Sequence, residues 1–480
     1  MIKSLKEKWS QIPLTVKVST AYAVCSILQK CLSFITLPLF TRLLTTEQYG
    51  QYTIYSSWSG ILTIFLTLNL AYGSFQTAMV KFENRREEYI TSIQAICMIL
   101  CCVFLAIYLP FRNSWNQLFE LPTPFVILLV AEIIFSTATQ LWMGKNRFEF
   151  KYKSVVLVTL LTSILSPIVA FILVELVDEK GYARILGYAI VNILIGFVLF
   201  AYNSQKGKHF YNKEFWKYAV EFNVPLLAYY LSQVVFNQSD RIMISHITGT
   251  GDAAMYGVAY NLAMILTFVL NAINSSYVPW MYEKIKEDKC SENKTISLML
   301  AILMGLMILC VIWYAPEIIV IMAGEQYKAA IYVVAPVAMS LFLLFYCQLF
   351  INVEFYYEEK KMLIYGSIGA ALLNIVLNYI LIPTCGFVAA GYTTLISYIV
   401  FALSNYYTMR LVFQKRQLVD ELYNYKGLLL IFAVFMASGF LGVALYGNLM
   451  FRITITLIVL GLLVIYRNRF LNVLKQIRRK

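Results

Sequence analysis

The feature that most constrains this sequence is a regular alternation of long apolar stretches and short polar loops. About fourteen apolar stretches of roughly twenty residues recur between Thr15 and Tyr466. A helix of that length crosses the ~30 Å hydrocarbon core of a bilayer. Two of the stretches, 90–109 and 295–314, contain no charged residue. Since backbone polar groups in lipid must be satisfied within the segment, we predict an all-α polytopic membrane protein with about 14 transmembrane helices.

The distribution of basic residues predicts the orientation of these helices. Of the 39 Lys and Arg residues, 30 fall in every second loop, counted from the N-terminus. The intervening loops hold six, namely Arg42, Arg112, Lys180, Arg184, Lys328 and Arg452. By the positive-inside rule the richer set is cytoplasmic, so both termini are expected in the cytoplasm. The net charge of +13 is therefore interpreted as a topology signal, and no nucleic-acid partner is expected.

A weak internal repeat predicts two homologous halves. Tyr49-Gly50 and Tyr256-Gly257 follow similar polar loops at an offset of 207 residues, and Gly187-Tyr188 and Gly391-Tyr392 recur at an offset of 204. We predict an N-terminal six-helix lobe at 1–205 and a C-terminal six-helix lobe at 206–412. Six helices is an even number, so the lobes would be parallel repeats about an axis along the membrane normal. Residues 413–480 would form a C-terminal helical hairpin and a basic cytoplasmic tail.

Polar residues are unevenly shared among the predicted spans. In the first and seventh spans they recur every three or four residues, which places them on one helical face. We predict that these stripes line a central cavity between the lobes. The alternative is that Ser, Thr and Asn side chains join neighbouring helices. The candidate cavity residues from these stripes and from the eighth span are Ser26, Gln29, Gln233, Asn237 and Asn274.

Four charged residues lie inside predicted spans, where each costs roughly 2.5–3.5 kcal/mol at mid-helix. They are Lys30, Glu132, Asp240 and Arg241. With Arg42, the two cations would suit a phosphate or an acidic sugar, while Asp240 and Glu132 are candidates for ion or proton coupling. The alternatives are that Lys30 and Arg42 snorkel to the headgroups, that Asp240 and Arg241 form structural ion pairs, and that Glu132 neutralises Lys30 or Arg241.

Several signatures of enzymes are missing from the sequence. It contains no Walker A motif, no G-x-G-x-x-G and no H-E-x-x-H. No cysteine shows metal-ligand spacing, and no outer loop is long enough for a folded domain. These absences favour transport over catalysis, with no catalytic residue, no metal and no cofactor; an H+ or Na+ gradient is the candidate energy source.

Three segments resemble a known family, the Wzx-type polysaccharide-biosynthesis flippases of the multidrug/oligosaccharidyl-lipid/polysaccharide (MOP) exporter superfamily. They are LPLFTRLLTTEQYG at 37–50, DRIMIS at 240–245 with the following Tyr256-Gly257, and GFVAAGY at 386–392. The resemblance implies a two-lobed alternating-access fold in the bacterial inner (plasma) membrane. It also implies transfer of an undecaprenyl-pyrophosphate-linked oligosaccharide, a repeat unit of O-antigen or capsule, from the cytoplasmic to the outer leaflet. The implied partners are this lipid-linked oligosaccharide, membrane lipids, a polysaccharide polymerase and glycosyltransferases.

Two alternative functions stay open at this point. A cation-coupled multidrug or small-molecule antiporter of the same superfamily is disfavoured by a cationic cavity, since exported drugs are often cations. A polytopic glycosyltransferase or polymerase is disfavoured by the short outer loops.

Overall fold

The described part of the chain is helical throughout, with no strand among its residues. The computed structural model describes residues 13–287, 289–358, 361–416, 422–458 and 461. The chain divides into two compact units, Met1–Ser245 and His246–Lys480. The predicted all-α membrane fold is thereby confirmed.

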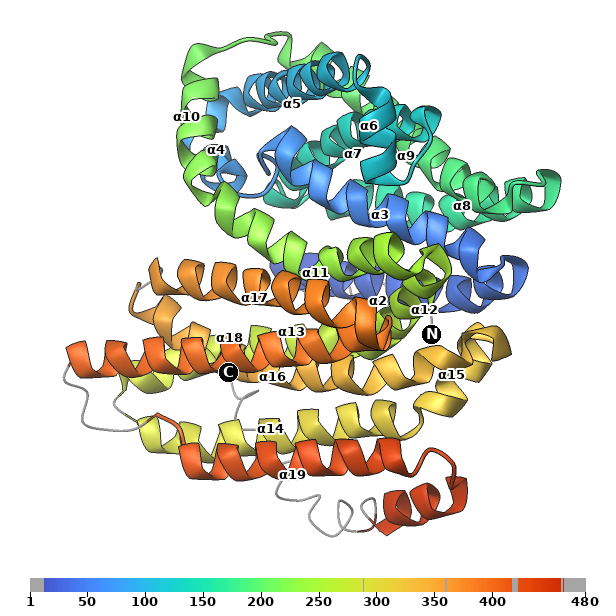
Figure 1. The fold of residues 1–480 in the computed structure, drawn as a ribbon. Helices are drawn as coiled ribbons and strands as arrows, with labels where there is room; N and C mark the ends of the chain where they lie inside the picture. The colour runs from blue at the N-terminus through green and yellow to red at the C-terminus, as the bar shows by residue number, and fades with distance from the viewer. Residues whose placement is uncertain (1–12, 288, 359–360, 417–421, 459–460, 462–480) are drawn as a thin grey trace, which may run out of the picture. The chain divides into compact units, whose positions relative to one another are not determined.

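The first unit is built around long helices joined by short connections (Figure 1). Helix α9 packs against α7 and α8, α2 packs against α8, and α5 packs against α7 and α9. The elements are α2 (Leu14–Leu43), α3 (Thr46–Thr67), α4 (Phe75–Lys81), η1 (Glu83–Arg85), α5 (Arg86–Tyr108), α6 (Arg112–Phe119), α7 (Thr123–Phe148), α8 (Tyr152–Leu176), α9 (Lys180–Gly207), α10 (Lys213–Asn223), η2 (Val224–Leu226) and α11 (Leu227–Thr248).

The second unit repeats part of this packing pattern. Helix α18 packs against α16 and α17, much as α9 packs against α7 and α8, and α14 runs beside α19 (Figure 1). The elements are α12 (Thr250–Ala263), η3 (Met264–Leu266), α13 (Thr267–Lys286), α14 (Cys290–Trp313), α15 (Ala315–Ala323), η4 (Glu325–Ala330), α16 (Ile331–Tyr356), α17 (Lys361–Cys385), α18 (Val388–Lys415) and α19 (Tyr425–Ala444).

The start of α3 shows how local sequence fixes a helix boundary. The hydroxyl of Thr45 accepts a hydrogen bond from the backbone N–H of Gln48, at 3.3 Å, and the side chain of Gln48 accepts one from the backbone N–H of Thr45, at 3.1 Å. This capping box satisfies two N–H groups that the first helical turn leaves without partners. Tyr49 and Gly50 therefore lie in the first turns of a helix, where both are buried.

Twelve helical segments of the described chain are long and apolar enough to cross a membrane. The predicted second span corresponds to α3 and α4, which are not among the twelve. The predicted fourteenth span begins in the shorter apolar helix Leu449–Ile458. Its remainder, like the basic tail at 467–480 and most of the N-terminal basic segment, lies outside the described residues. A count of fourteen spans therefore stays a prediction.

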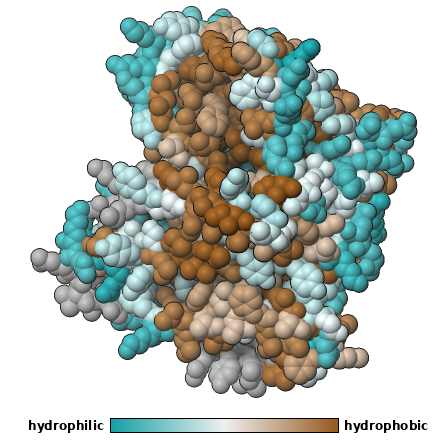
Figure 2. Space-filling view, viewed as in Figure 1, coloured by the Kyte–Doolittle hydropathy of each residue, from teal (hydrophilic) through white to brown (hydrophobic). Residues whose placement is uncertain are grey.

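The surface of the helices is strongly apolar. Figure 2 shows many hydrophobic side chains on the visible surface of the helices, with hydrophilic ones among them. Large side chains such as Leu194, Leu429 and Tyr379 are 61%, 67% and 73% exposed. Exposed apolar area on this scale is expected of helices that face lipid.

The compact units divide the chain at a different place from the predicted repeat. Helix α10 lies in the first unit, where Phe215 and Ala219 join a buried cluster with Phe82 and Tyr89. At its end, the Asn223 amide donates to the Ser74 hydroxyl at 2.7 Å. The segment 206–245 thus packs with the first unit. The repeat boundary near residue 205 stays a prediction, because homology between the halves defines it and contacts do not.

Two arginines that the charge count assigned to outer loops are buried. Arg184 lies in α9 and is 5% exposed. Arg452 lies in the helix Leu449–Ile458 and is 1% exposed. Its guanidinium forms a bidentate pair with Glu317, at 2.7 and 2.8 Å, and also donates to the backbone carbonyls of Trp313 and Tyr446. Neither residue is a solvated loop charge.

Candidate functional site

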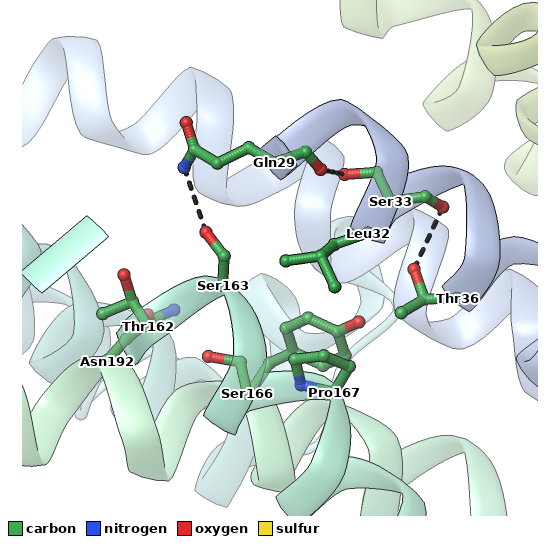
Figure 3. A pocket seen from close by; sticks show the side chains of 10 residues that line it. Gln29, Leu32, Ser33, Thr36, Thr162, Ser163, Ser166, Pro167 and Asn192 are labelled. Atoms are coloured by element: carbon green, nitrogen blue, oxygen red, sulfur yellow. Dashed lines mark hydrogen bonds between the residues drawn. The ribbon is translucent and has the colours of Figure 1, made fainter. Parts of the chain in front are cut away.

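A polar cavity of about 290 Å³ lies inside the first unit between α2, α8 and α9. Eight of its ten lining residues carry a hydroxyl or an amide, and none is charged. Figure 3 shows Gln29 of α2 reaching across to Ser163 of α8. The lining residues are Gln29, Leu32, Ser33 and Thr36 from α2, Thr162, Ser163, Ser166 and Pro167 from α8, and Tyr188 and Asn192 from α9.

The hydroxyl groups of this cavity are oriented by their own helices. Ser33 donates to the carbonyl of Gln29, and Thr36 to that of Ser33, each at 3.0 Å. Thr162 and Ser163 both donate to the carbonyl of Thr159, at 2.9 and 2.7 Å. Such back-bonding is common for Ser and Thr inside helices. It commits the hydroxyl hydrogens to the backbone, so the oxygen lone pairs remain for other partners.

A carboxylate stands directly behind the cavity. The carboxylate of Glu132, on α7, accepts from the Tyr55 hydroxyl at 2.7 Å and from the Asn192 amide at 2.8 Å. Asn192 therefore links the cavity wall to this acid. Within the described chain no ion pair joins Glu132 to Lys30 or Arg241, and a role of Glu132 as their neutralising partner stays a prediction. Hydrogen bonds from neutral donors hold its carboxylate.

A buried cation lies one helical turn from the cavity. The guanidinium of Arg184 lies 4.5, 4.3 and 3.9 Å from the ring centres of Phe40, Tyr49 and Tyr52. No carboxylate of the described residues pairs with it. Tyr188, which lines the cavity, lies between this group and the polar wall and contacts both Phe40 and Tyr52 through its ring. Cation–π contacts therefore stabilise the charge of Arg184.

The predicted site residues of α2 divide between the cavity and the surface of the first unit. Gln29 lines the cavity of α2, α8 and α9 within the first unit, whereas the predicted central cavity between the lobes stays a prediction. Ser26, Lys30 and Arg42 are exposed on the unit. Exposure is compatible with substrate contact and with snorkelling, so the cationic patch stays a prediction.

The predicted residues of α11 form a second group in the same unit. Gln233 and Asn237 are partly buried, and the Asn237 amide donates to the Gln233 carbonyl at 2.7 Å. Asp240 is fully buried, and Arg241 is 8% exposed and donates to Gln238 at 3.1 Å. None of these α11 residues lines the cavity of α2, α8 and α9.

The predicted residue Asn274 lies in the second unit. On α13 its side-chain oxygen accepts from the Asn352 amide of α16 at 2.8 Å. This interhelical amide pair matches the alternative in which polar side chains join neighbouring helices.

The sequence reasoning missed several polar residues of the membrane helices. Ser163 and Ser166, which line the cavity, sit on α8. Glu354 is 1% exposed near the end of α16, and neither of its carboxylate oxygens has a hydrogen-bond partner in the described chain. The charged run that begins four residues after Glu354, at 358–361, made it resemble a loop residue.

Among the described residues no group of three or more His, Cys, Asp or Glu side chains could hold a metal ion. The polar atoms that line the cavity are uncharged oxygens and nitrogens, which can bind a ligand through hydrogen bonds.

Two solved structures have folds similar to that of this chain. The chain is similar to the lipid II flippase MurJ in its inward closed conformation, with a TM-score of 0.67, 12% identity and coverage of 90% of this chain and 99% of that one. It is also similar to an inward-facing multidrug resistance MATE family transporter of the MOP superfamily, with a TM-score of 0.65, 13% identity and coverage of 82% and 96%. The chain therefore shares the fold of these two structures.

Sequence comparison identifies the family more closely. Residues 16–285, more than half of the chain, match the profile of the family described as polysaccharide biosynthesis protein. The chain belongs to this family. A relative from Haemophilus influenzae, the Lsg locus putative protein 1, is 23% identical over 380 residues, covering 75% of this chain and 89% of that protein.

Proposed function

We propose that this protein moves a lipid-linked oligosaccharide across the membrane. The observation that carries the proposal is the uncharged polar cavity between three membrane helices, in a chain of the polysaccharide biosynthesis family. Polar groups inside a membrane protein are costly and mark ligand pathways. The site offers hydrogen bonds and no catalytic group, which supports transport and not covalent chemistry.

The finer proposal is that the substrate is an undecaprenyl-pyrophosphate-linked repeat unit, moved from the cytoplasmic to the outer leaflet by alternating access. Lys30, Arg42 and Arg241 would bind the pyrophosphate, while Asp240 and Glu132 would couple transport to an H+ or Na+ gradient. Sugars would contact the polar residues Ser26, Gln29, Gln233, Asn237 and Asn274. A polymerase and glycosyltransferases would act on the same glycan. A cation-coupled small-molecule antiporter is the second candidate, supported by the fold it shares with the MATE transporter.

The proposed location is the bacterial inner membrane with both termini in the cytoplasm. The support is the 30-to-6 distribution of basic residues between alternate loops. A cysteine placed at Lys208 in a cysteine-free background is expected to resist an impermeant thiol reagent in intact cells and to react after permeabilisation. Reaction in intact cells would reverse the topology.

The double variant Lys30→Ala, Arg241→Ala is expected to lose export. Each charge-assisted contact to a phosphate is worth ~1.5–3 kcal/mol, so surface polysaccharide should fall at least about tenfold. The measurement is complementation of a flippase-deficient strain, scored for surface polysaccharide and for the amount of protein in the membrane. Lys30→Arg should keep part of the activity, because a diffuse anion responds to charge more than to shape.

The matched control is Lys217→Ala, which removes a 69% exposed cation outside the proposed site. It should export normally.

Glu132→Gln, assayed in the same strain, should export less and lose its response to collapse of the ion gradient. Full complementation by the double variant at normal abundance would exclude the cationic binding role.

A further inference from the structure

The cavity between α2, α8 and α9 presents mainly hydrogen-bond acceptors. The hydroxyl hydrogens of Ser33, Thr36, Thr162 and Ser163 are committed to backbone carbonyls. Each amide of the wall also uses one of its two N–H groups, since Gln29 donates to Ser163 at 3.0 Å and Asn192 donates to Glu132. What remains is mainly a set of oxygen lone pairs on hydroxyls and amide carbonyls, with the second N–H of each amide and the hydroxyl of Ser166 as the fewer donors.

We infer that this cavity is a binding site for the neutral, hydroxyl-bearing sugar portion of the substrate and that it excludes anionic groups. Sugar hydroxyls donate hydrogen bonds to acceptor oxygens, whereas a phosphate or carboxylate has no hydrogen to donate to them. No Lys or Arg lines the cavity to offset the repulsion of an anion. The inference deepens the proposed function and rests on it.

The free polar groups and the apolar residues of the wall agree with a sugar ring. The Ser166 side chain, 4% exposed, makes no hydrogen bond in the described chain and borders the cavity, so it can both donate and accept. Leu32, Pro167 and the ring of Tyr188 offer apolar surface to the carbon–hydrogen face of a pyranose. A few placed polar groups among apolar ones are the usual composition of a small-ligand site.

A dehydrated cation is a poorer occupant. Hard cations need several oxygens converging at about 2.3–2.6 Å and usually a carboxylate. The lining holds no carboxylate, and both oxygens of Glu132 are engaged by Tyr55 and Asn192. A cavity of about 290 Å³ is also far larger than one ion needs. Entry of a larger ligand is compatible with the exposure of Ser33 on α2.

The test is direct binding of small glycosides to the purified full-length protein. The probes are the methyl glycosides of glucose and N-acetylglucosamine, with methyl glucuronide as the anionic counterpart, in saturation-transfer NMR at millimolar concentration. We expect at least one neutral glycoside to bind and the glucuronide to bind at least about tenfold more weakly. The double variant Thr162→Val, Ser163→Ala removes two acceptor oxygens with little change in volume. Since each hydrogen bond contributes ~0.5–1.5 kcal/mol, its affinity should fall about fivefold or more.

The matched control is Thr139→Val, because Thr139 is also back-bonded, to Phe135 at 3.2 Å, but does not line the cavity. It should bind like the unmodified protein, and equal thermal stability of both variants shows that they fold. Absence of binding by every neutral glycoside, equal binding of the glucuronide, or unchanged affinity of the double variant would each overturn the inference. The flippase proposal fails separately, if the unmodified chain does not restore surface polysaccharide in the deficient strain.

Discussion

Gly187→Ala is expected to prevent the first unit from assembling. A β-carbon at position 187 would lie 2.3 Å from the Cα atom of Ala170 and 2.6 Å from its backbone nitrogen. Because these are backbone atoms, no side-chain rotation relieves the clash, and α8 and α9 must separate. Overpacking a tight contact lowers the free energy of unfolding by ~1–3 kcal/mol, and by more where the backbone must move. We therefore expect Gly187→Ala to lower it by at least about 3 kcal/mol.

The measurement is the amount of folded protein in membranes and its thermal unfolding temperature in detergent. The control is Gly369→Ala on α17, where an added β-carbon meets no atom within 4 Å. This change should leave stability equal or raise it by up to about 1 kcal/mol, since alanine favours a helix over glycine. Normal abundance and unfolding temperature of Gly187→Ala would show that α8 and α9 do not approach as described.

Arg452→Ala is expected to destabilise the second unit strongly. The buried guanidinium joins Glu317 at the start of α15 to the carbonyls of Trp313 and Tyr446, so its removal leaves several polar groups without partners at once. Removal of one member of a buried ion pair lowers the free energy of unfolding by ~3–5 kcal/mol. Because Glu317 is partly exposed, we expect a loss of ~3 kcal/mol, at the lower end of this range. Thermal unfolding in detergent measures it.

The same pair predicts a dependence on pH. The hydrogen bonds from Arg452 lower the pKa of Glu317 from its ordinary value of 4.5. A carboxyl whose pKa is lower in the folded state stabilises the protein above the unfolded pKa and loses this effect as the pH falls through the folded pKa. The difference in unfolding temperature between the unmodified protein and Glu317→Gln should therefore be largest near pH 7 and shrink below about pH 4. Glu325→Gln, which alters an exposed acid, should show almost no difference at either pH. A difference that stays constant with pH would contradict the role of the Glu317 charge.

The candidate site could be predicted only in part. The period of the polar stripe places Gln29 on one face of the first span, and Gln29 lines a cavity within the first unit, while the predicted cavity between the lobes stays a prediction. The opposite wall, with Ser163 and Ser166, could not be derived, since nothing in the sequence states that α8 faces α2. Charge was a poor guide to burial: Lys30 and Arg42 are exposed, whereas Arg184 and Arg452, close to helix ends, are buried.

The sequence by itself determined that the chain forms long apolar helices. The physical reason is that lipid offers no hydrogen bonds, so each spanning segment must satisfy its own backbone and match the bilayer thickness. Capping residues such as Thr45 and Gln48 fixed some of the ends. The tertiary structure alone decided which helix lies at the centre of its unit. The apolar windows of α16 and α19 are similarly hydrophobic, yet 89% of the first and 22% of the second are buried. Lipid tails are as apolar as leucine side chains, so the sequence of an apolar helix does not indicate whether its neighbours are lipid or protein.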